Sequence, residues 1–468
     1  MNPWRATLKL TLLALAVLLL GLTPYPQPFT LAMRRAENHL VAQEYGAALD
    51  AYQQAASLDA QSPRPWLGLG QIYLQRHRYV LATAAFFAAE QLGGGEEAVF
   101  GLADSYARRG DWAAAIGHWL RAQILAPDDA RVYVALGRGF IAQGQFDQAR
   151  GYLTRALQLE PSVEEAASAH ALLGRLLIDD DPGLAASHFR QAGDEDMLAV
   201  LAAVDAEADP ARRALLLGIA ALQRNELSLA RYHLERASTL APDGAESWAY
   251  LAHTLDQQGE TVAAGELLAR AVALDGESAL IYYFLGTHHR LVGRLGDAQA
   301  ALWQALLRDP ENAAFRAEMA GTFVDQSDYP HAEEWYVGAV DAAPDDVNFH
   351  LMLVRFYLDH LYRVTEGGVP AAEALVGLAP GDARAYDLLG WAYLLAGRQA
   401  EGRQALLRAL ALEPNLVSAH FHLGSLYLNT GQRDLARQHL QRAADLDQQG
   451  FYRSRADFLL EGMETGSN

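Results

Sequence analysis

The sequence predicts an all-α solenoid preceded by a hydrophobic helix at the N-terminus. Three observations predict the solenoid. A unit of about 34 residues recurs along the chain, and each unit holds two amphipathic segments with apolar residues at helical spacing. The chain of 468 residues is also too long for one ordinary compact core, whereas stacked repeats extend their core with every unit. We therefore expect about twelve helix-turn-helix units.

The stretch 131–161 shows what one unit requires. Apolar and small residues share one face of each half, namely Tyr133, Leu136, Gly137 and Phe140, then Phe146, Ala149, Leu153 and Ala156. Gly144 lies between the halves and suits the left-handed residue that ends a helix, and Pro161 ends the second helix because it lacks an amide donor. Each unit therefore needs its neighbours to bury both faces.

Residues 1–28 form a predicted signal-anchor or transmembrane segment. Arg5 and Lys9 precede an uncharged run from Leu10 to Thr23, as in export signals and membrane anchors. The run is shorter than the roughly 20 residues of a full span, which fits a signal peptide. The lack of a small-x-small cleavage motif favours an uncleaved anchor, and cleavage stays the alternative. The positive-inside rule places the repeats outside the cytoplasm.

The first predicted array covers 29–192. Its later units start near Pro63, Glu96, Ala130 and Glu164. The fifth unit is degenerate, because its turn is rebuilt as an acidic stretch ending in Pro182 and Gly183. The register breaks at 193–210, which we interpret as an irregular helical connector or a hinge.

The second predicted array covers 211–450. Its turns repeat those of the first array, with Gly259, Gly293, Gly397 and Gly431 matching Gly110 and Gly144, and with Asn225 in place of glycine once. Residues suited to helix N-caps follow the unit ends, namely Asp128, Asp129, Asp243, Asn312, Asp345, Asp346, Asp382 and Asn415. The segment 364–369 is predicted to be a loop insertion. Residues 451–468 are predicted to form a capping helix from Phe451 to Met463 and a frayed tail.

Composition restricts the function. The chain has no cysteine, which excludes disulfides, thiolate metal sites and thiol nucleophiles. Its formal charge of −20 disfavours nucleic acid and anionic lipid, and it would steer a basic partner toward the array. Solubility is the alternative explanation of this charge, and the one that we prefer.

No motif predicts catalysis, a cofactor or a metal. The sequence 137–142 matches the dinucleotide fingerprint G-x-G-x-x-A, but Gly137 occupies the small-residue position of a repeat helix instead of a strand-to-helix turn. The His288-His289 and His420-x-His422 pairs lack a metal-protease motif and favour ordinary packing or surface positions. About eighteen residues follow the last unit, too few for a catalytic domain. We therefore expect no enzyme, no cofactor and no small-molecule substrate.

The repeat positions resemble those of the tetratricopeptide repeat family. The residues that carry the resemblance are Trp66, Leu69, Gly70 and Tyr73 with Ala82, Phe86 and Ala89; Trp248, Leu251 and Ala252 with Ala264, Leu268 and Ala271; Tyr386, Leu389, Gly390 and Tyr393 with Leu406, Ala409 and Pro414; and His420, Leu423, Gly424 and Tyr427 with Ala436, Leu440 and Ala443. The resemblance covers nearly all of 29–450. It implies a right-handed superhelix whose first helices line a concave groove for partner peptides.

Nine residues fall at the groove-facing positions that the resemblance implies. They are His253, Tyr283, Thr287, Arg290, Arg355, Asp387, Trp391, Phe421 and Ser425. Aromatic and polar groups together would suit peptide recognition. The alternative is that Tyr283, Trp391 and Phe421 pack between neighbouring repeats.

The predicted function is a non-catalytic scaffold, tethered to a membrane, that binds protein or peptide partners. An accessory subunit of a cell-envelope machine for secretion, polysaccharide export or cell-wall assembly is the alternative. A catalytic site in the groove is a third hypothesis, which requires His253, Arg355 and Asp387 to converge there. The sequence does not identify the partner.

Overall fold

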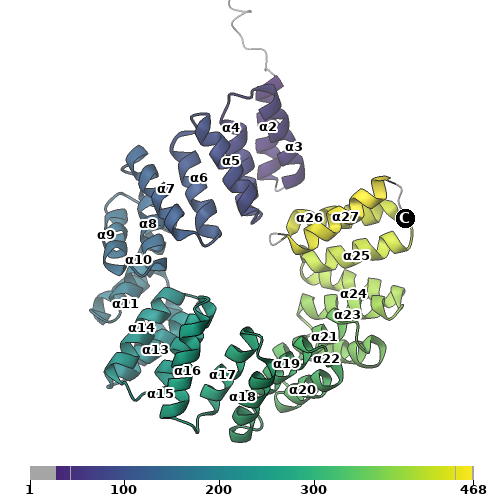
Figure 1. The fold of residues 1–468 in the computed structure, drawn as a ribbon. Helices are drawn as coiled ribbons and strands as arrows, with labels where there is room; N and C mark the ends of the chain where they lie inside the picture. Colours follow the sequence, from purple (N-terminus) through teal and green to yellow (C-terminus); the bar gives the residue numbers. More distant parts are fainter. Residues whose placement is uncertain (1–27, 43, 448–449, 466–468) are drawn as a thin grey trace, which may run out of the picture. The chain divides into compact units, whose positions relative to one another are not determined.

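The computed structural model describes residues 28–42, 44–447 and 450–465. Within these ranges every regular element is a helix, which confirms the all-α class, and helix pairs follow one another along the chain (Figure 1). No helix in the described ranges has both the length and the apolar character needed to cross a membrane. The predicted membrane segment 1–28 lies outside the described residues except for its last position.

The described residues form two compact units, which divide between Leu125 and Ala126. The first unit contains three helix pairs: α2 (Pro28–Val41) and α3 (Tyr45–Leu58), α4 (Arg64–Gln75) and α5 (Tyr79–Gln91), and α6 (Gly95–Arg108) and α7 (Trp112–Leu125). These pairs stack in chain order through contacts of α3 with α4 and of α5 with α6.

The second unit begins with two further pairs and a single helix: α8 (Ala130–Ala142), α9 (Phe146–Leu157), α10 (Val163–Leu177), α11 (Pro182–Ala192) and α12 (Glu195–Asp205). Seven pairs and a last helix follow: α13 (Pro210–Gln223), α14 (Leu227–Leu240), α15 (Ala245–Gln257), α16 (Thr261–Leu274), α17 (Ala279–Leu291), α18 (Leu295–Arg308), α19 (Ala313–Asp325), α20 (Tyr329–Ala342), α21 (Val347–Asp359), α22 (Val369–Leu378), α23 (Ala383–Leu395), α24 (Gln399–Leu412), α25 (Val417–Asn429), α26 (Arg433–Leu446) and α27 (Phe451–Thr465). The described residues thus hold twelve pairs, as the repeat length predicts. Helix α12 occupies the predicted connector, and the boundaries of the two predicted arrays stay a prediction.

Small residues set the spacing of the two helices in a pair. A Cβ atom added to Gly137 of α8 would lie 2.5 Å from Leu153 of α9, and the same contact recurs at Gly424, where it would lie 2.7 Å from Leu440. No real side chain tolerates such distances, so glycine at this position lets the leucine of the second helix fill the crossing. Ala149, in α9, is fully buried.

The turns between paired helices match the prediction. Gly144 has a φ of 72° and Asn225 a φ of 57°, so both residues occupy the left-handed region. Glycine has no steric penalty there, and asparagine is among the residues that tolerate it best. Where the predicted turn residues occur, they therefore end the first helix of the pair by their backbone geometry.

The predicted N-caps are confirmed at four helices and wrong at two. Side chains of Asp129, Asn312, Asp346 and Asp382 accept hydrogen bonds from the first turns of α8, α19, α21 and α23. Asp243 and Asn415 do not cap, because Gly244 and Leu416 occupy the cap positions of α15 and α25. The Asn415 side chain instead accepts a hydrogen bond from Arg442 at 2.7 Å.

One further local prediction is wrong. The segment predicted as a loop insertion is a π-helix, Val364–Gly368, which runs directly into α22. The amides of Gly367 and Gly368 donate to the carbonyl of Arg363, and Arg363 takes a left-handed φ of 43°.

The predicted capping helix is present as α27, which continues to Thr465 and buries Met463.

Candidate functional site

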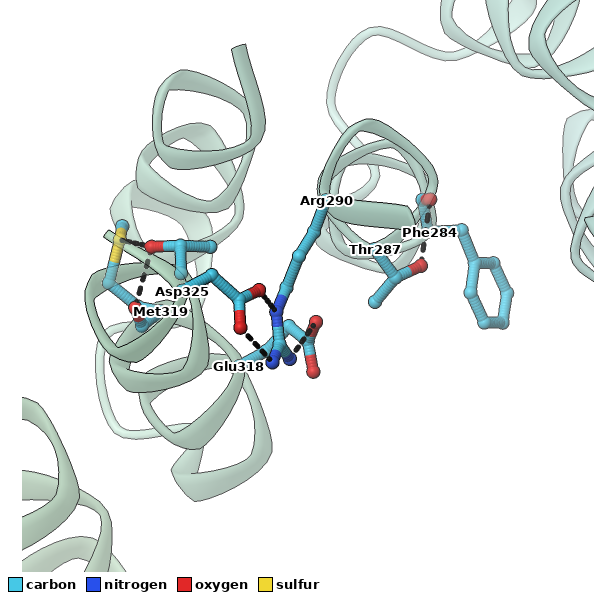
Figure 2. Close-up of polar contacts among 7 residues, drawn as sticks. Phe284, Thr287, Arg290, Glu318, Met319 and Asp325 are labelled. Atoms are coloured by element: carbon cyan, nitrogen blue, oxygen red, sulfur yellow. Dashed lines mark hydrogen bonds and ion pairs between the residues drawn. The ribbon is translucent and has the colours of Figure 1, made fainter. Parts of the chain in front are cut away.

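The predicted groove residues of the second unit lie on five first helices: α15, α17, α21, α23 and α25. Arg290 of α17 makes the most extensive polar contact. Its Nε donates to Asp325 Oδ2 at 2.6 Å and its Nη1 donates to Glu318 Oε1 at 3.0 Å, and both carboxylates belong to α19 (Figure 2). The guanidinium therefore links two consecutive repeats.

A glycine makes room for this link. A Cβ at Gly321 of α19 would lie 2.5 Å from Arg290 Nη1. Burial opposes the charge of Arg290, but its hydrogen bonds and its attraction to Asp325 and Glu318 outweigh burial and raise the pKa of Arg290 above its usual value. The side chain is 31% exposed. Because two carboxylates already occupy its donors, Arg290 is better suited to holding α17 against α19 than to binding a partner.

Aromatic rings connect the same helices. His253 of α15 stacks on Phe284 of α17 with 4.7 Å between centroids, and Tyr283 of α17 stacks on Phe315 of α19 at 5.1 Å. Thr287 donates its hydroxyl to the carbonyl of Phe284 at 2.9 Å (Figure 2). Burial lowers the pKa of His253 and raises the pKa of Tyr283. These contacts agree with the packing alternative for Tyr283.

A second cluster joins α23, α25 and α27. Asp387 of α23 is 4% exposed, and its Oδ1 lies 2.8 Å from Nδ1 of His422 in α25. Trp391 stacks on the His422 ring at 5.0 Å, and Phe421 contacts Tyr452 of α27 at 5.2 Å. Burial, with the nearby Asp387 carboxylate, raises the pKa of Tyr452 to about 12. Three of the predicted residues are therefore brought together around the buried contact between Asp387 and His422.

Arg355 and Ser425 are the two predicted residues without such packing. Arg355 of α21 is 67% exposed, and its only hydrogen bond given by the structure runs from Nε to Asp359 at 3.4 Å. Met352, one turn earlier on α21, is also exposed. Ser425 is half-buried on α25. Helix α21 thus presents an exposed arginine and, one turn before it, an exposed methionine.

The structure does not assemble the three residues of the catalytic hypothesis. His253 contacts α17, Asp387 contacts α25, and Arg355 contacts its own helix. Within the described ranges no group of three or more histidine, aspartate or glutamate side chains is placed to hold a metal ion. The contacts of His253 and Asp387 are those of packing between repeats.

Sequence reasoning missed the partners of these residues. Asp256 of α15 and His288 of α17 form another buried pair, with Oδ1 and Nδ1 2.9 Å apart, and neither was among the nine. Glu318 and Asp325 were missed as well. A search for opposite charges in neighbouring repeats, roughly one repeat length apart, could have found them, because such residues meet when first helices stack.

Comparison with known proteins identifies the repeat. Family models described as tetratricopeptide repeat match residues 33–96, 130–163, 215–279, 283–347, 383–416 and 417–449, more than half of the chain. The stretches 130–163, 383–416 and 417–449 each begin with the first helix of a pair and contain both of its helices. No curated protein matches the chain by sequence.

Several solved structures are similar to the chain. Yeast Tom70 has 15% identity and a TM-score of 0.42, and the match covers 94% of this chain and 96% of Tom70. The APC/C hetero-tetramer Cut9-Hcn1 has 16% identity and a TM-score of 0.39, and the match covers 89% of this chain and 98% of the matched chain. MamA from Desulfovibrio magneticus RS-1 has 23% identity and a TM-score of 0.32, and the match covers 36% of this chain and 94% of the MamA chain. None of these similarities carries information about the partners of this chain.

Proposed function

The chain belongs to the tetratricopeptide repeat family, and from this premise we propose that it is a non-catalytic scaffold that holds protein partners on its repeats. The observation that carries the proposal is the contrast along the first helices. Most predicted groove residues are occupied by neighbouring repeats, whereas Arg355 and Met352 on α21 stay exposed. An exposed arginine beside a methionine can contact both a carboxylate and an apolar side chain of a partner. We place the main contact of the predicted groove at α21.

The proposal includes a membrane tether. The basic and apolar pattern of residues 1–28 supports an anchor, and the same pattern supports repeats outside the cytoplasm. A tether would keep the scaffold and its partners at one membrane surface, which raises their effective concentration without any new contact.

Partner capture tests the scaffold. The full chain with a C-terminal tag is purified from its own cells in mild detergent, as wild type, as Arg355→Glu, and as Arg403→Glu. Arg403 is an exposed arginine of α24, a second helix, so its replacement controls for the same change of charge at another position. We expect one partner set with wild type and Arg403→Glu, reduced at least fivefold with Arg355→Glu. Equal recovery from all three would place the contact elsewhere, and turnover of a substrate by the purified chain would contradict a scaffold.

Proximity labelling tests the tether. A labelling enzyme is fused to the C-terminus, and the labelled proteins are identified by mass spectrometry. We expect extracytoplasmic partners that belong to one assembly. A set of cytoplasmic proteins would overturn the proposed orientation while leaving the scaffold proposal intact.

A further inference from the structure

A cavity of about 460 Å³ lies within the second unit, away from the predicted groove residues. The turn between α8 and α9, the end of α10 and the middle of α14 form its wall. Two contacts hold α14 beside the turn: Ser228 donates its hydroxyl to the carbonyl of Ala142 at 2.7 Å, and the rings of Phe146 and Tyr232 meet edge to face at 4.9 Å. A shallower hollow of about 400 Å³ continues from it along α9. The cavity therefore lies where repeats far apart in the sequence meet.

The cations in the cavity wall already have acidic partners. Arg150 donates to Asp180 at 2.9 Å, and Arg175 contacts both Asp194 at 3.0 Å and Glu226 at 2.8 Å. An anionic ligand would have to compete with these carboxylates. The wall is therefore poorly suited to a carboxylate or a phosphate.

One carboxylate of the wall is different. Asp147 is exposed, it lines both hollows, and the structure gives it no ion pair with any described residue. It lies in the first turn of α9, where the helix dipole favours its negative charge. The rim of the cavity thus carries an exposed acidic side chain that a basic group can reach.

Aromatic surface stands in the same wall. Tyr232 is 41% exposed although it is a large ring, and Phe146 is partly buried against it. The faces of such rings attract ammonium and guanidinium groups. The cavity thus has an acid that can accept hydrogen bonds from a basic side chain and two rings that can stack against it.

Two buried donors in the wall also lack hydrogen-bond partners. They are the Nε atoms of Arg150 and Arg175. Asp179 Oδ2, by contrast, is held by charged contacts with His233 Nδ1 at 3.1 Å and Arg236 Nη1 at 2.9 Å. Folded proteins leave few buried polar atoms unpaired. A peptide that enters the cavity brings carbonyl acceptors, which can reach the two Nε donors after small side-chain rotations.

We propose that this cavity binds a basic side chain, an arginine above all, from a peptide segment of a partner protein. The side chain lies between Asp147 and the Tyr232 ring, and the peptide follows the hollow along α9. The formal charge of −20 attracts such a segment from a distance. This site is separate from α21, so it does not depend on the partner contact proposed above.

Titration with short peptides tests the site. The full chain in non-ionic detergent is titrated calorimetrically, at low salt, with acetyl-Gly-Arg-Gly-Arg-Gly-amide and with the same peptide in which citrulline replaces arginine. Citrulline keeps the shape and loses the charge. We expect the arginine peptide to bind at least fivefold more tightly than the citrulline peptide. Equal binding of the two peptides, or no binding of the arginine peptide, would overturn the proposal.

Matched variants place the binding. Asp147→Asn is expected to weaken binding of the arginine peptide at least fivefold, and Tyr232→Leu at least threefold. Glu266 is an exposed acid outside the cavity, so Glu266→Gln is expected to leave this binding unchanged. Thermal unfolding of each variant checks that the fold is kept. If Asp147→Asn and Glu266→Gln weaken binding equally, the peptide responds only to the net charge of the chain, and the proposed site is wrong.

Discussion

At the scale of single residues, glycine acts in two opposite ways in this chain. Gly137 of α8 faces Leu153 across a helix crossing, whereas Gly151 of α9 has no atom within 4 Å of the position where a Cβ would be. We expect Gly137→Ala to cost about 1–3 kcal/mol of unfolding free energy by overpacking. Gly151→Ala should instead stabilise by about 0.5–1 kcal/mol, since alanine is the better helix former. Urea unfolding of both variants checks this prediction. If the unfolding free energy changes in the same direction in both variants, the description of the helix crossing is wrong.

The buried pair Asp387 and His422 gives a second prediction at this scale. Removing one partner leaves the other buried and unpaired, so Asp387→Ala should cost about 3–5 kcal/mol. Asp359→Ala, which removes an exposed acid of α21, should cost less than about 1 kcal/mol. A double-mutant cycle of Asp387→Ala and His422→Ala is expected to show strong coupling. Additive effects would show that the two side chains do not stabilise each other.

At the scale of helix pairs, two repeats contain facing histidines. Nδ1 of His170 in α10 lies 2.7 Å from Nδ1 of His188 in α11, and Nδ1 of His420 in α25 lies 3.0 Å from Nδ1 of His439 in α26. One ring must donate and the other accept, so neither pair can take up two protons without repulsion. Burial lowers the pKa of all four histidines, with the facing ring adding to the effect at His170 and His439.

This arrangement predicts loss of stability in mild acid. A histidine whose pKa is lower in the folded state is protonated more readily in the unfolded chain. Its contribution to stability is therefore complete above about pH 6.5, the unfolded value, and is lost as the pH falls from there toward the folded value. Urea midpoints between pH 7.5 and 5.5 should fall for the wild type and change less when His188 and His439 are both replaced by glutamine. Equal pH dependence of the two proteins would assign the acid sensitivity to other groups.

At the scale of the whole molecule, each repeat depends on its neighbours for a closed core. Helix α27 buries Ala456 and Met463 in one cluster with Leu440 of α26, and Tyr452 packs on Phe421 of α25. A chain that ends at Gly450 should therefore lose amide-exchange protection in α25 and α26 and keep it in α8 and α9. Uniform loss along the second unit would mean that its repeats unfold as a single cooperative body.

The sequence alone determined the repeat length, the twelve helix pairs, the turns at residues such as Gly144 and the crossing at Gly137. These features depend on residues within one repeat, so periodicity and local propensity predict them. The sequence predicted too many helix caps, since Asp243 and Asn415 lie one residue before the cap positions of α15 and α25. The π-helix was predicted as a loop. The tertiary structure alone decided the partners of Arg290 and Asp387 and the cavity beside Tyr232. Those contacts join side chains of different repeats, and their distances depend on how consecutive helices stack, which no local pattern records.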